Sequence, residues 1–108
     1  PDYGGSDSNI NPEQKLAAAV SSCFMMTFLA LAAKMKWPVK NYKDKAISYL
    51  GKNNEGRMYV NKIELNPQII FDNDFTISDD EMHKMKERSH KYCFIANSLS
   101  KDVEIKIN

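Results

Sequence analysis

The chain has 108 residues, of which 43% are hydrophobic, and a formal net charge of +1. This length predicts one domain with a modest core, and the near-neutral charge argues against nucleic acid or an anionic membrane as the main partner. Two cysteines are too few for a secreted disulfide scaffold, and no signal peptide is visible, so we expect a cytoplasmic protein. A basic segment from Lys34 to Lys45, interrupted by Asp44, is interpreted as ordinary solvated surface.

The first predicted element is a long helix that follows a polar, glycine-containing lead-in over residues 1–10. Asn11 is a good N-cap, Pro12 suits the first helical position, and Gln14 completes a capping box. Pro38 disfavours helical backbone in the residue before it, so the helix should end near Trp37.

This helix carries no charge from Leu16 to Ala33, a length that is also typical of a transmembrane span. Its six alanines, its three hydroxyl side chains and the polar sequence on both sides favour a central core helix instead. A helix that is apolar all round needs cover on every side. A chain this short does not easily supply that cover, so we expect a homodimer in which the helix is largely buried.

Two segments with strand character follow, over residues 39–51 and 57–71, on either side of the turn-rich sequence KNNEG. Apolar residues fall on even positions before Lys62 and on odd positions after it, which indicates strand pairing with a bulge or twist near that residue. Pro67 indicates a sheet edge or a break in the strand.

The last third of the chain predicts a helix and a strand. Ser78 with Glu81 forms a second capping box, which opens a helix over residues 79–97. Apolar residues alternate from Val103 to Ile107 in a final strand. The order of helix, hairpin, helix and strand predicts an α+β domain.

Four side chains, Cys23, Cys93, His83 and His90, are candidates for chemistry. They are not spaced as zinc ligands, and no glycine-rich phosphate loop is present, so we expect no metal and no cofactor. No hydrolase triad is arranged by the sequence. Cys23 has apolar neighbours one turn away and no cation, which predicts a raised pKa and an inert thiol unless a positive group comes from another element. Each thiol, taken alone, is more commonly structural.

Two segments together change this interpretation. NPEQKLAAAVSSCF and SHKYCFIANSL resemble the two cysteine-bearing motifs of the OsmC/Ohr family, the osmotically inducible and organic-hydroperoxide-resistance proteins. Glu13 lies ten positions before Cys23 in the first segment, and His90 lies three positions before Cys93 in the second. The resemblance covers nearly the whole chain. It implies an OsmC-like fold, with a long central helix packed on antiparallel sheet, in an intertwined homodimer.

The resemblance also implies an activity. Many members of the family are thiol peroxidases that reduce organic hydroperoxides, so Cys23 would become a sulfenic acid and Cys93 would resolve it as a disulfide. A dithiol such as a lipoylated protein would then reduce the disulfide, and Glu13 would help to hold a catalytic arginine. The alternative is a dimeric binding or stress-response protein of the same fold whose cysteines do not turn over.

Glu13 and Cys23 cannot meet on one helix, because ten helical residues rise roughly 15 Å. We therefore expect Glu13 to act in the site of a partner subunit. The family's arginine comes from an N-terminal strand, and neither Arg57 nor Arg88 matches it. Residues 1–108 are accordingly interpreted as a single OsmC-like domain that lacks the N-terminal strands of the family.

Two further features concern the site. Phe94 follows the second cysteine where the best-known peroxidases often have proline, which resembles an OsmC-like branch of the family. Phe24, Met26 and His90 are candidate pocket residues for an alkyl peroxide, although methionine and phenylalanine on a central helix are also typical of a core.

Overall fold

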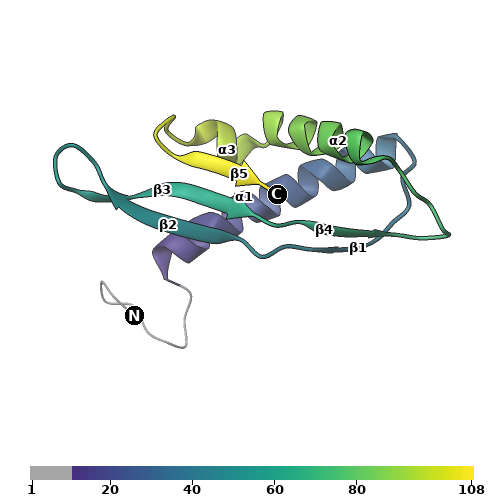
Figure 1. The fold of residues 1–108 in the computed structure, drawn as a ribbon, viewed down its shortest axis with the longest axis horizontal. Coiled ribbons are helices and arrows are strands. Elements are labelled where there is room, and N and C mark those ends of the chain that lie inside the picture. Colours follow the sequence, from purple (N-terminus) through teal and green to yellow (C-terminus); the bar gives the residue numbers. More distant parts are fainter. Residues whose placement is uncertain (1–10) are drawn as a thin grey trace.

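The protein is described here by a computed structural model that covers residues 11–108, so the expected glycine-containing lead-in over residues 1–10 lies outside the described part. Residues 11–108 form three helices and five strands, and their order of helix, paired strands, helices and strand follows the order predicted from the sequence (Figure 1). The α+β class is therefore confirmed. The elements are α1 (Pro12–Lys34), β1 (Val39–Lys43), β2 (Ile47–Lys52), β3 (Met58–Leu65), β4 (Gln68–Phe71), α2 (Asp79–Lys91), α3 (Phe94–Ser98) and β5 (Glu104–Ile107).

The strands form two small sheets along one extended hairpin. β1 pairs antiparallel with β4, and β2 pairs antiparallel with β3, with an interruption at Pro67 that confirms the expected break. The bulge near Lys62 is also confirmed, because Tyr49 pairs with Lys62 and Leu50 with Val60, which leaves Asn61 as the extra residue. One expectation needs correction: β5 lies parallel to β3, so the second sheet is mixed and not purely antiparallel.

Helix α1 begins as the sequence predicts and ends earlier. The side chain of Asn11 accepts a hydrogen bond from the backbone N–H of Gln14 at 2.8 Å, and the Gln14 side chain accepts from the N–H of Asn11 at 3.1 Å. The last helical residue is Lys34, and Lys36 has a left-handed φ of 59°. The expected end near Trp37 was wrong because the chain reverses there, which returns Trp37 to the core beside Phe28.

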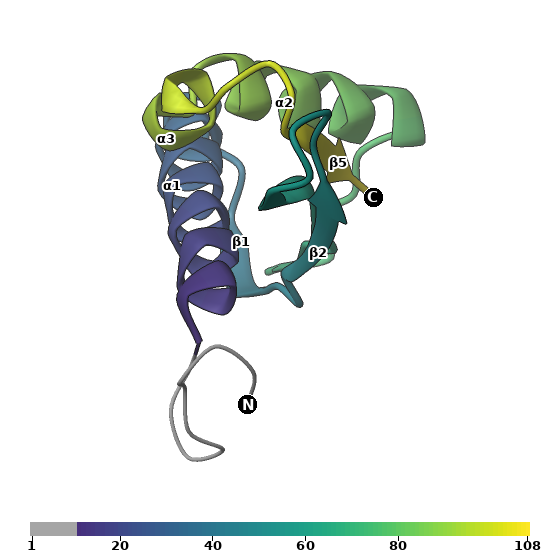
Figure 2. The same ribbon diagram turned by 90° about the vertical axis from the view of Figure 1, so that its left-hand side faces the viewer.

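One face of α1 packs on the sheets. Its buried residues recur every three or four positions, which is the spacing of one side of a helix. Figure 2 shows α1 and β2 on opposite sides of the domain, with α2 and α3 lying across one end. Ile63 and Leu65 of β3 and Met85 of α2 complete the core. The buried residues of α1 are Ala17, Val20, Phe24, Phe28 and Ala32.

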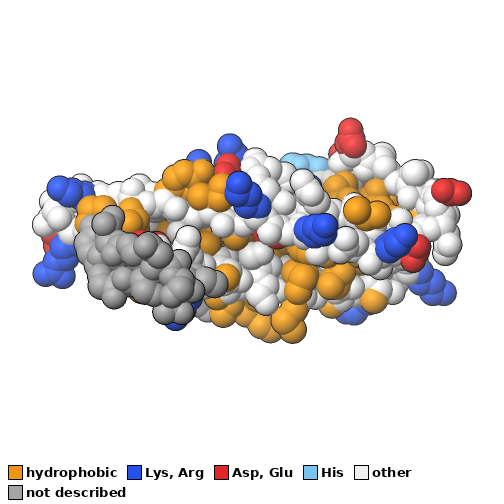
Figure 3. All heavy atoms as spheres, turned by 90° about the horizontal axis from the view of Figure 1, so that it is seen from below, with side chains coloured by type: hydrophobic (Ala, Val, Ile, Leu, Met, Phe, Trp, Pro, Cys, Tyr) orange, Lys and Arg blue, Asp and Glu red, His pale blue; other side chains and the backbone are white. Residues whose placement is uncertain are grey.

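The opposite face of α1 is exposed, so the helix is not buried all round within one chain. Hydrophobic side chains gather along the lower margin of the molecule in Figure 3, over this helix. By length and composition α1 could cross a membrane, but such a test is also passed by core helices, and five of its residues lie in the core. The exposed residues include Ala18, Ala19, Ser22, Met26, Ala30 and Ala33.

The helix expected over residues 79–97 is divided in two. α2 ends at Lys91, and Cys93 has extended backbone and acts as the N-cap residue of the short helix α3. The side chain of Asn97 donates a hydrogen bond to the carbonyl of Lys91 at 2.9 Å, which satisfies the end of α2. This break turns the first backbone N–H groups of α3 toward the cysteine that precedes them.

Candidate functional site

The two cysteines meet between α1 and α3. Cys23 lies in the middle of α1 and is half-buried, whereas Cys93 is only 1% exposed. Both are free thiols, and their sulfur atoms lie within hydrogen-bonding reach of each other. Seventy positions of sequence separate them, so this pairing depends on α3 folding back onto α1.

Several hydrogen-bond donors act on the sulfur of Cys23. Partial burial works to raise the pKa of this thiol, but the backbone N–H of Ile95, the thiol of Cys93, the N–H of Phe94 and the hydroxyl of Thr27 together outweigh it. The pKa of Cys23 therefore lies below its ordinary value. Donors that bond to the thiolate favour the charged form. The expectation of a raised pKa for this thiol was wrong, because neutral hydrogen-bond donors outweigh the effect of burial.

Cys93 has the opposite tendency. Burial raises the pKa of its thiol, and the neighbouring Cys23 raises it further, against a smaller lowering by backbone N–H groups of α3 such as that of Ala96. Of the two thiols, Cys23 is therefore the stronger acid. A thiolate is the nucleophilic form of cysteine, so Cys23 is the better placed of the two to attack.

A cavity of about 990 Å³ lies against Cys23, and we call it the thiol cavity. Apolar side chains form most of its lining. Two cations, Lys34 and Arg88, line it as well, and no carboxylate does. This size and character suit an organic molecule. The lining residues are Ala19, Ser22, Cys23, Met26, Thr27, Ala30, Leu31, Lys34, Arg88, Tyr92, Phe94 and Ile95.

The three candidate pocket residues lie in different parts of the structure. Met26 lines the thiol cavity and is 66% exposed. Phe24 does not line it, because its side chain faces the opposite side of α1 and is buried in the core. His90 lies on the other side of α2, in a separate cavity of about 400 Å³ beside β5. The assignment of Phe24 and His90 to the pocket is therefore corrected.

Glu13 is not brought to the thiols of its own chain. It lines a separate cavity of about 410 Å³ at the start of α1, formed with apolar residues of the β2–β3 hairpin such as Leu50 and Met58. The distance along the helix accounts for this separation, as the sequence predicts. Among residues 11–108, no three histidine, cysteine or acidic side chains group as metal ligands.

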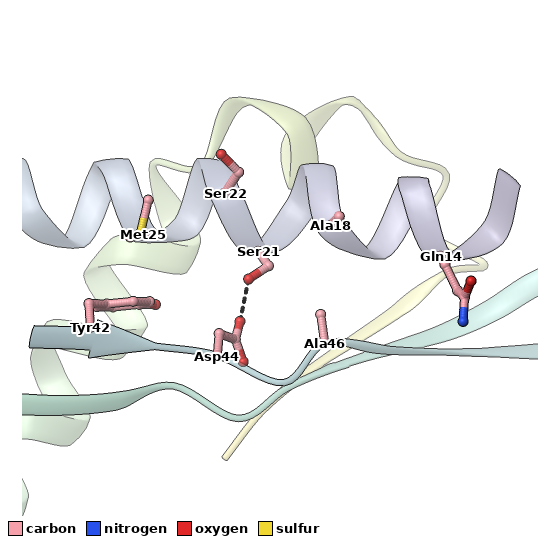
Figure 4. A pocket seen from close by; sticks show the side chains of 8 residues that line it. All are labelled: Gln14, Ala18, Ser21, Ser22, Met25, Tyr42, Asp44 and Ala46. Carbon is pink, nitrogen blue, oxygen red and sulfur yellow. Dashed lines mark hydrogen bonds between the residues drawn. The ribbon is translucent and has the colours of Figure 1, made fainter. Parts of the chain in front are cut away.

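Another cavity, of about 460 Å³, lies between α1 and the β1–β2 segment (Figure 4). The hydroxyl of Ser21 donates to Asp44 at 2.5 Å, and the other oxygen of Asp44 accepts the backbone N–H of Asn66 at 2.6 Å. Asp44 thus ties α1 to the turn between β3 and β4. The hydroxyl of Tyr42 is buried without a hydrogen-bond partner in the described chain, and burial, with a further contribution from Asp44, raises its pKa.

Sequence reasoning missed several residues around Cys23. Thr27 stands four positions after it on α1, a spacing that places both side chains on one face. The sequence analysis considered only charged neighbours of Cys23 and therefore overlooked this hydroxyl. Arg88 was set aside because it does not match the family's arginine, yet it lines the thiol cavity. The N–H groups of Phe94 and Ile95 are free to bond to Cys23 because they lie in the first turn of a separate helix, α3, which the sequence analysis did not predict.

The structure is therefore an α+β domain in which two free cysteines lie together beside a long helix. The chain belongs to the OsmC-like protein family, whose pattern matches residues 5–108, so the family resemblance is confirmed. No protein of curated function matches it.

Solved structures agree with this assignment. An OsmC-like protein of unknown function from Vibrio cholerae is 38% identical, with a TM-score of 0.87 over 100% of this chain and 70% of that one. Organic hydroperoxide resistance proteins from Legionella pneumophila and Elizabethkingia anophelis share the fold. The first is 21% identical with a TM-score of 0.77, over 96% of this chain and 72% of that one. The second is 23% identical with a TM-score of 0.79, over 97% and 71%.

Proposed function

We propose that this protein is a thiol peroxidase that reduces organic hydroperoxides, with Cys23 as the attacking thiol and Cys93 as the resolving one. The observation that carries the proposal is the lowered pKa of Cys23, produced by donors that include the thiol of Cys93, at the wall of an apolar cavity. Organic hydroperoxide resistance is the named role of structural relatives from Legionella pneumophila and Elizabethkingia anophelis, which agrees with it.

The reaction balances with the groups present and one external reductant. The Cys23 thiolate attacks the outer peroxide oxygen, the O–O bond breaks, and the alkoxide leaves and takes a proton to become the alcohol. Cys23 is then a sulfenic acid. The thiol of Cys93 attacks its sulfur, a disulfide forms, and water leaves. A dithiol, such as that of a lipoylated protein, reduces the disulfide and becomes oxidised itself.

Assembly is part of the proposal. The exposed apolar face of α1 is the surface on which a second copy would pack, and we propose a homodimer formed there. Glu13 lies far from Cys23 of its own chain, so its proposed role is to orient a cation in the partner's site. Sedimentation at micromolar concentration tests the assembly, and a compact monomer of 12.4 kDa at all concentrations would contradict it.

The decisive experiment is single-turnover kinetics with tert-butyl hydroperoxide. We expect Cys23→Ser to abolish peroxide consumption. Cys93→Ser should allow one turnover and then stop as a sulfenic acid on Cys23. In the wild type, mass spectrometry after one equivalent of peroxide should show the loss of two hydrogens within one chain.

Two results would count against this assignment. If Cys93→Ser removes the first turnover while Cys23→Ser keeps it, the roles of the two thiols are reversed. If the wild type consumes no peroxide, the protein is not a peroxidase.

Glu13→Ala provides a further comparison. It should slow the attack of Cys23 on the peroxide in the dimer without unfolding the dimer.

A further inference from the structure

Helix α3 supplies two of the donors that act on Cys23, yet its own packing holds it only weakly. None of its five residues is buried. A helix of this length is too short to be stable by itself. Cys93, the residue before it, is buried and fixes its start. One fixed point leaves the helix free to change its angle, so a second contact must set the direction of its backbone N–H groups.

Asn97 provides this second contact. Its side chain donates to the carbonyl of Lys91 at 2.9 Å, and its backbone N–H donates to the carbonyl of Cys93 at 3.0 Å. Lys91 is the last residue of α2, and its carbonyl has no partner within that helix. Within residues 11–108, this is the only side-chain hydrogen bond that joins α2 to α3. Asn97 therefore ties α3 to a fixed point outside it.

Asn97 does not line the thiol cavity, whereas Phe94 and Ile95 of the same helix do. Any influence of Asn97 on Cys23 must therefore pass through the backbone of α3. The N–H groups of Phe94 and Ile95 bond to the sulfur of Cys23. Hydrogen bonds weaken steeply as the donor turns away from the acceptor. A small change in the angle of α3 would thus weaken both bonds while leaving the thiol in place.

We propose that Asn97 is a positioning residue, which holds α3 at the angle at which the N–H groups of Phe94 and Ile95 point at the sulfur of Cys23. This inference rests on the proposed function, because it concerns the thiol that attacks the peroxide there. Donors that bond to a thiolate stabilise the charged form. Without the amide of Asn97, Cys23 remains present and accessible, but a smaller fraction of it is ionised at neutral pH.

The test is Asn97→Leu, which keeps the branched shape of the side chain and removes its donor. Leucine is the better helix former, so a weaker helix cannot explain a loss. The rate of alkylation of Cys23 by iodoacetamide is measured as a function of pH, by mass spectrometry of the peptide that contains Cys23.

We expect the midpoint of the thiol titration to move to higher pH in Asn97→Leu. The rate at neutral pH should fall about 3- to 10-fold, since hydrogen bonds to a charged group are weakened and not lost. The rate at high pH should not fall, because the thiol is then fully ionised in the wild type and in the variant. A residue with a merely structural role would not shift the midpoint alone.

Ser98→Ala is the matched control on the same helix. The hydroxyl of Ser98 donates to the carbonyl of Phe94 at 2.8 Å, so this variant also removes one side-chain hydrogen bond from α3, but none that reaches α2. It should leave the midpoint as in the wild type. Neither variant alters the charged or titratable side chains that surround Cys23 within residues 11–108, which are Lys34, Arg88, Tyr92 and Cys93.

Three results would overturn the inference. The first is a midpoint that stays in place in Asn97→Leu, and the second is one that moves as far in Ser98→Ala. The third is a lower rate at high pH with an unchanged midpoint, which would show altered access to the thiol. Asn97→Ala, which places no apolar side chain on the surface, should repeat the shift. If Asn97→Leu alters the assembly in sedimentation and Asn97→Ala shifts nothing, the inference is likewise wrong.

Alkylation requires no peroxide, so this inference and the proposed function can fail separately. A protein that consumes no tert-butyl hydroperoxide but shows the shifted midpoint in Asn97→Leu retains the role of Asn97 and loses the peroxidase assignment. A protein that consumes the peroxide with the same pH dependence in the wild type and in Asn97→Leu keeps the assignment and loses the role of Asn97.

Discussion

The inner and outer faces of α1 are built from different residues, although they belong to one helix. The inner face presents Val20, Phe24 and Phe28 at intervals of four, and these side chains fill the core. The outer face presents small residues such as Ala19 and Ala30, which leave space beside Cys23. The large residues determine where the helix packs, and the small ones leave the thiol accessible. Core packing and access to the thiol are thus separated by rotation around one helix axis.

The strongest way to test this comparison is to truncate one large residue on each face. Phe28→Ala should lower the free energy of unfolding by about 3–5 kcal/mol, because it empties a fully buried site in contact with Trp37 and Tyr42. Met26→Ala should cost no more than about 0.5 kcal/mol at low protein concentration, since its side chain is largely exposed. Urea denaturation measures both.

The protein concentration sharpens this result. A cost of Met26→Ala that grows with concentration would show that the outer face is covered in a dimer, as proposed above. Equal costs for the two variants at every concentration would contradict the division of the helix into a packed and an open face.

Sequence reasoning recovered most of the fold because its signals are local. The capping box at Asn11, the break at Pro67 and the bulge near Lys62 each arise from the chemistry of neighbouring residues. The ends of the helices were harder. Trp37 leaves α1 for a tertiary reason, since its ring packs against Phe71, which lies far along the sequence.

The site was predicted less completely than the fold. The family resemblance brought Cys23 and Cys93 together, but two of the donors that lower the pKa of Cys23 are the backbone N–H groups of Phe94 and Ile95, which no residue type reveals in the sequence. The parallel pairing of β5 was missed for a similar reason: alternation identifies a strand without giving its direction. Phe24 was a candidate pocket residue because it is an apolar side chain of the central helix, but it points about 100° away from the adjacent Cys23 and enters the core.

A smaller effect is expected on the flank of α1 that faces β1. Ser21→Ala removes the hydroxyl that donates to Asp44, and we expect a loss of about 1–2 kcal/mol, since hydrogen bonds to charged groups are the stronger ones. Tyr42→Phe should leave stability unchanged or raise it by up to about 1 kcal/mol, because it removes a buried hydroxyl without a hydrogen-bond partner in the described chain. Thermal or urea unfolding compares the two. Neither variant should alter the reactivity of Cys23, which lies on the other flank of the helix.

The smallest expected effect is a change in the pKa of Cys23 when the hydroxyl of Thr27 is removed from the outer face of α1. Thr27 bonds through its hydroxyl to the carbonyl of Cys23 at 2.9 Å and also acts on the Cys23 sulfur. One hydroxyl hydrogen cannot serve both acceptors at once, so its contribution to the thiolate is partial and is the last in order among the groups that lower the pKa of Cys23. Removing it in Thr27→Val should therefore raise that pKa without returning it to its ordinary value, because the N–H donors from α3 remain. The rate of alkylation of Cys23 by iodoacetamide, measured as a function of pH, gives the midpoint of the thiol titration. Both the parent and the Thr27 variants carry Cys93→Ser in this experiment.

In that background we expect the midpoint to move to higher pH in Thr27→Val and to stay in place in Thr27→Ser, which keeps the hydroxyl. A midpoint that moves equally in both variants would assign the effect to helix packing, and one that moves in neither would leave the N–H groups of α3 as the donors that activate the thiol.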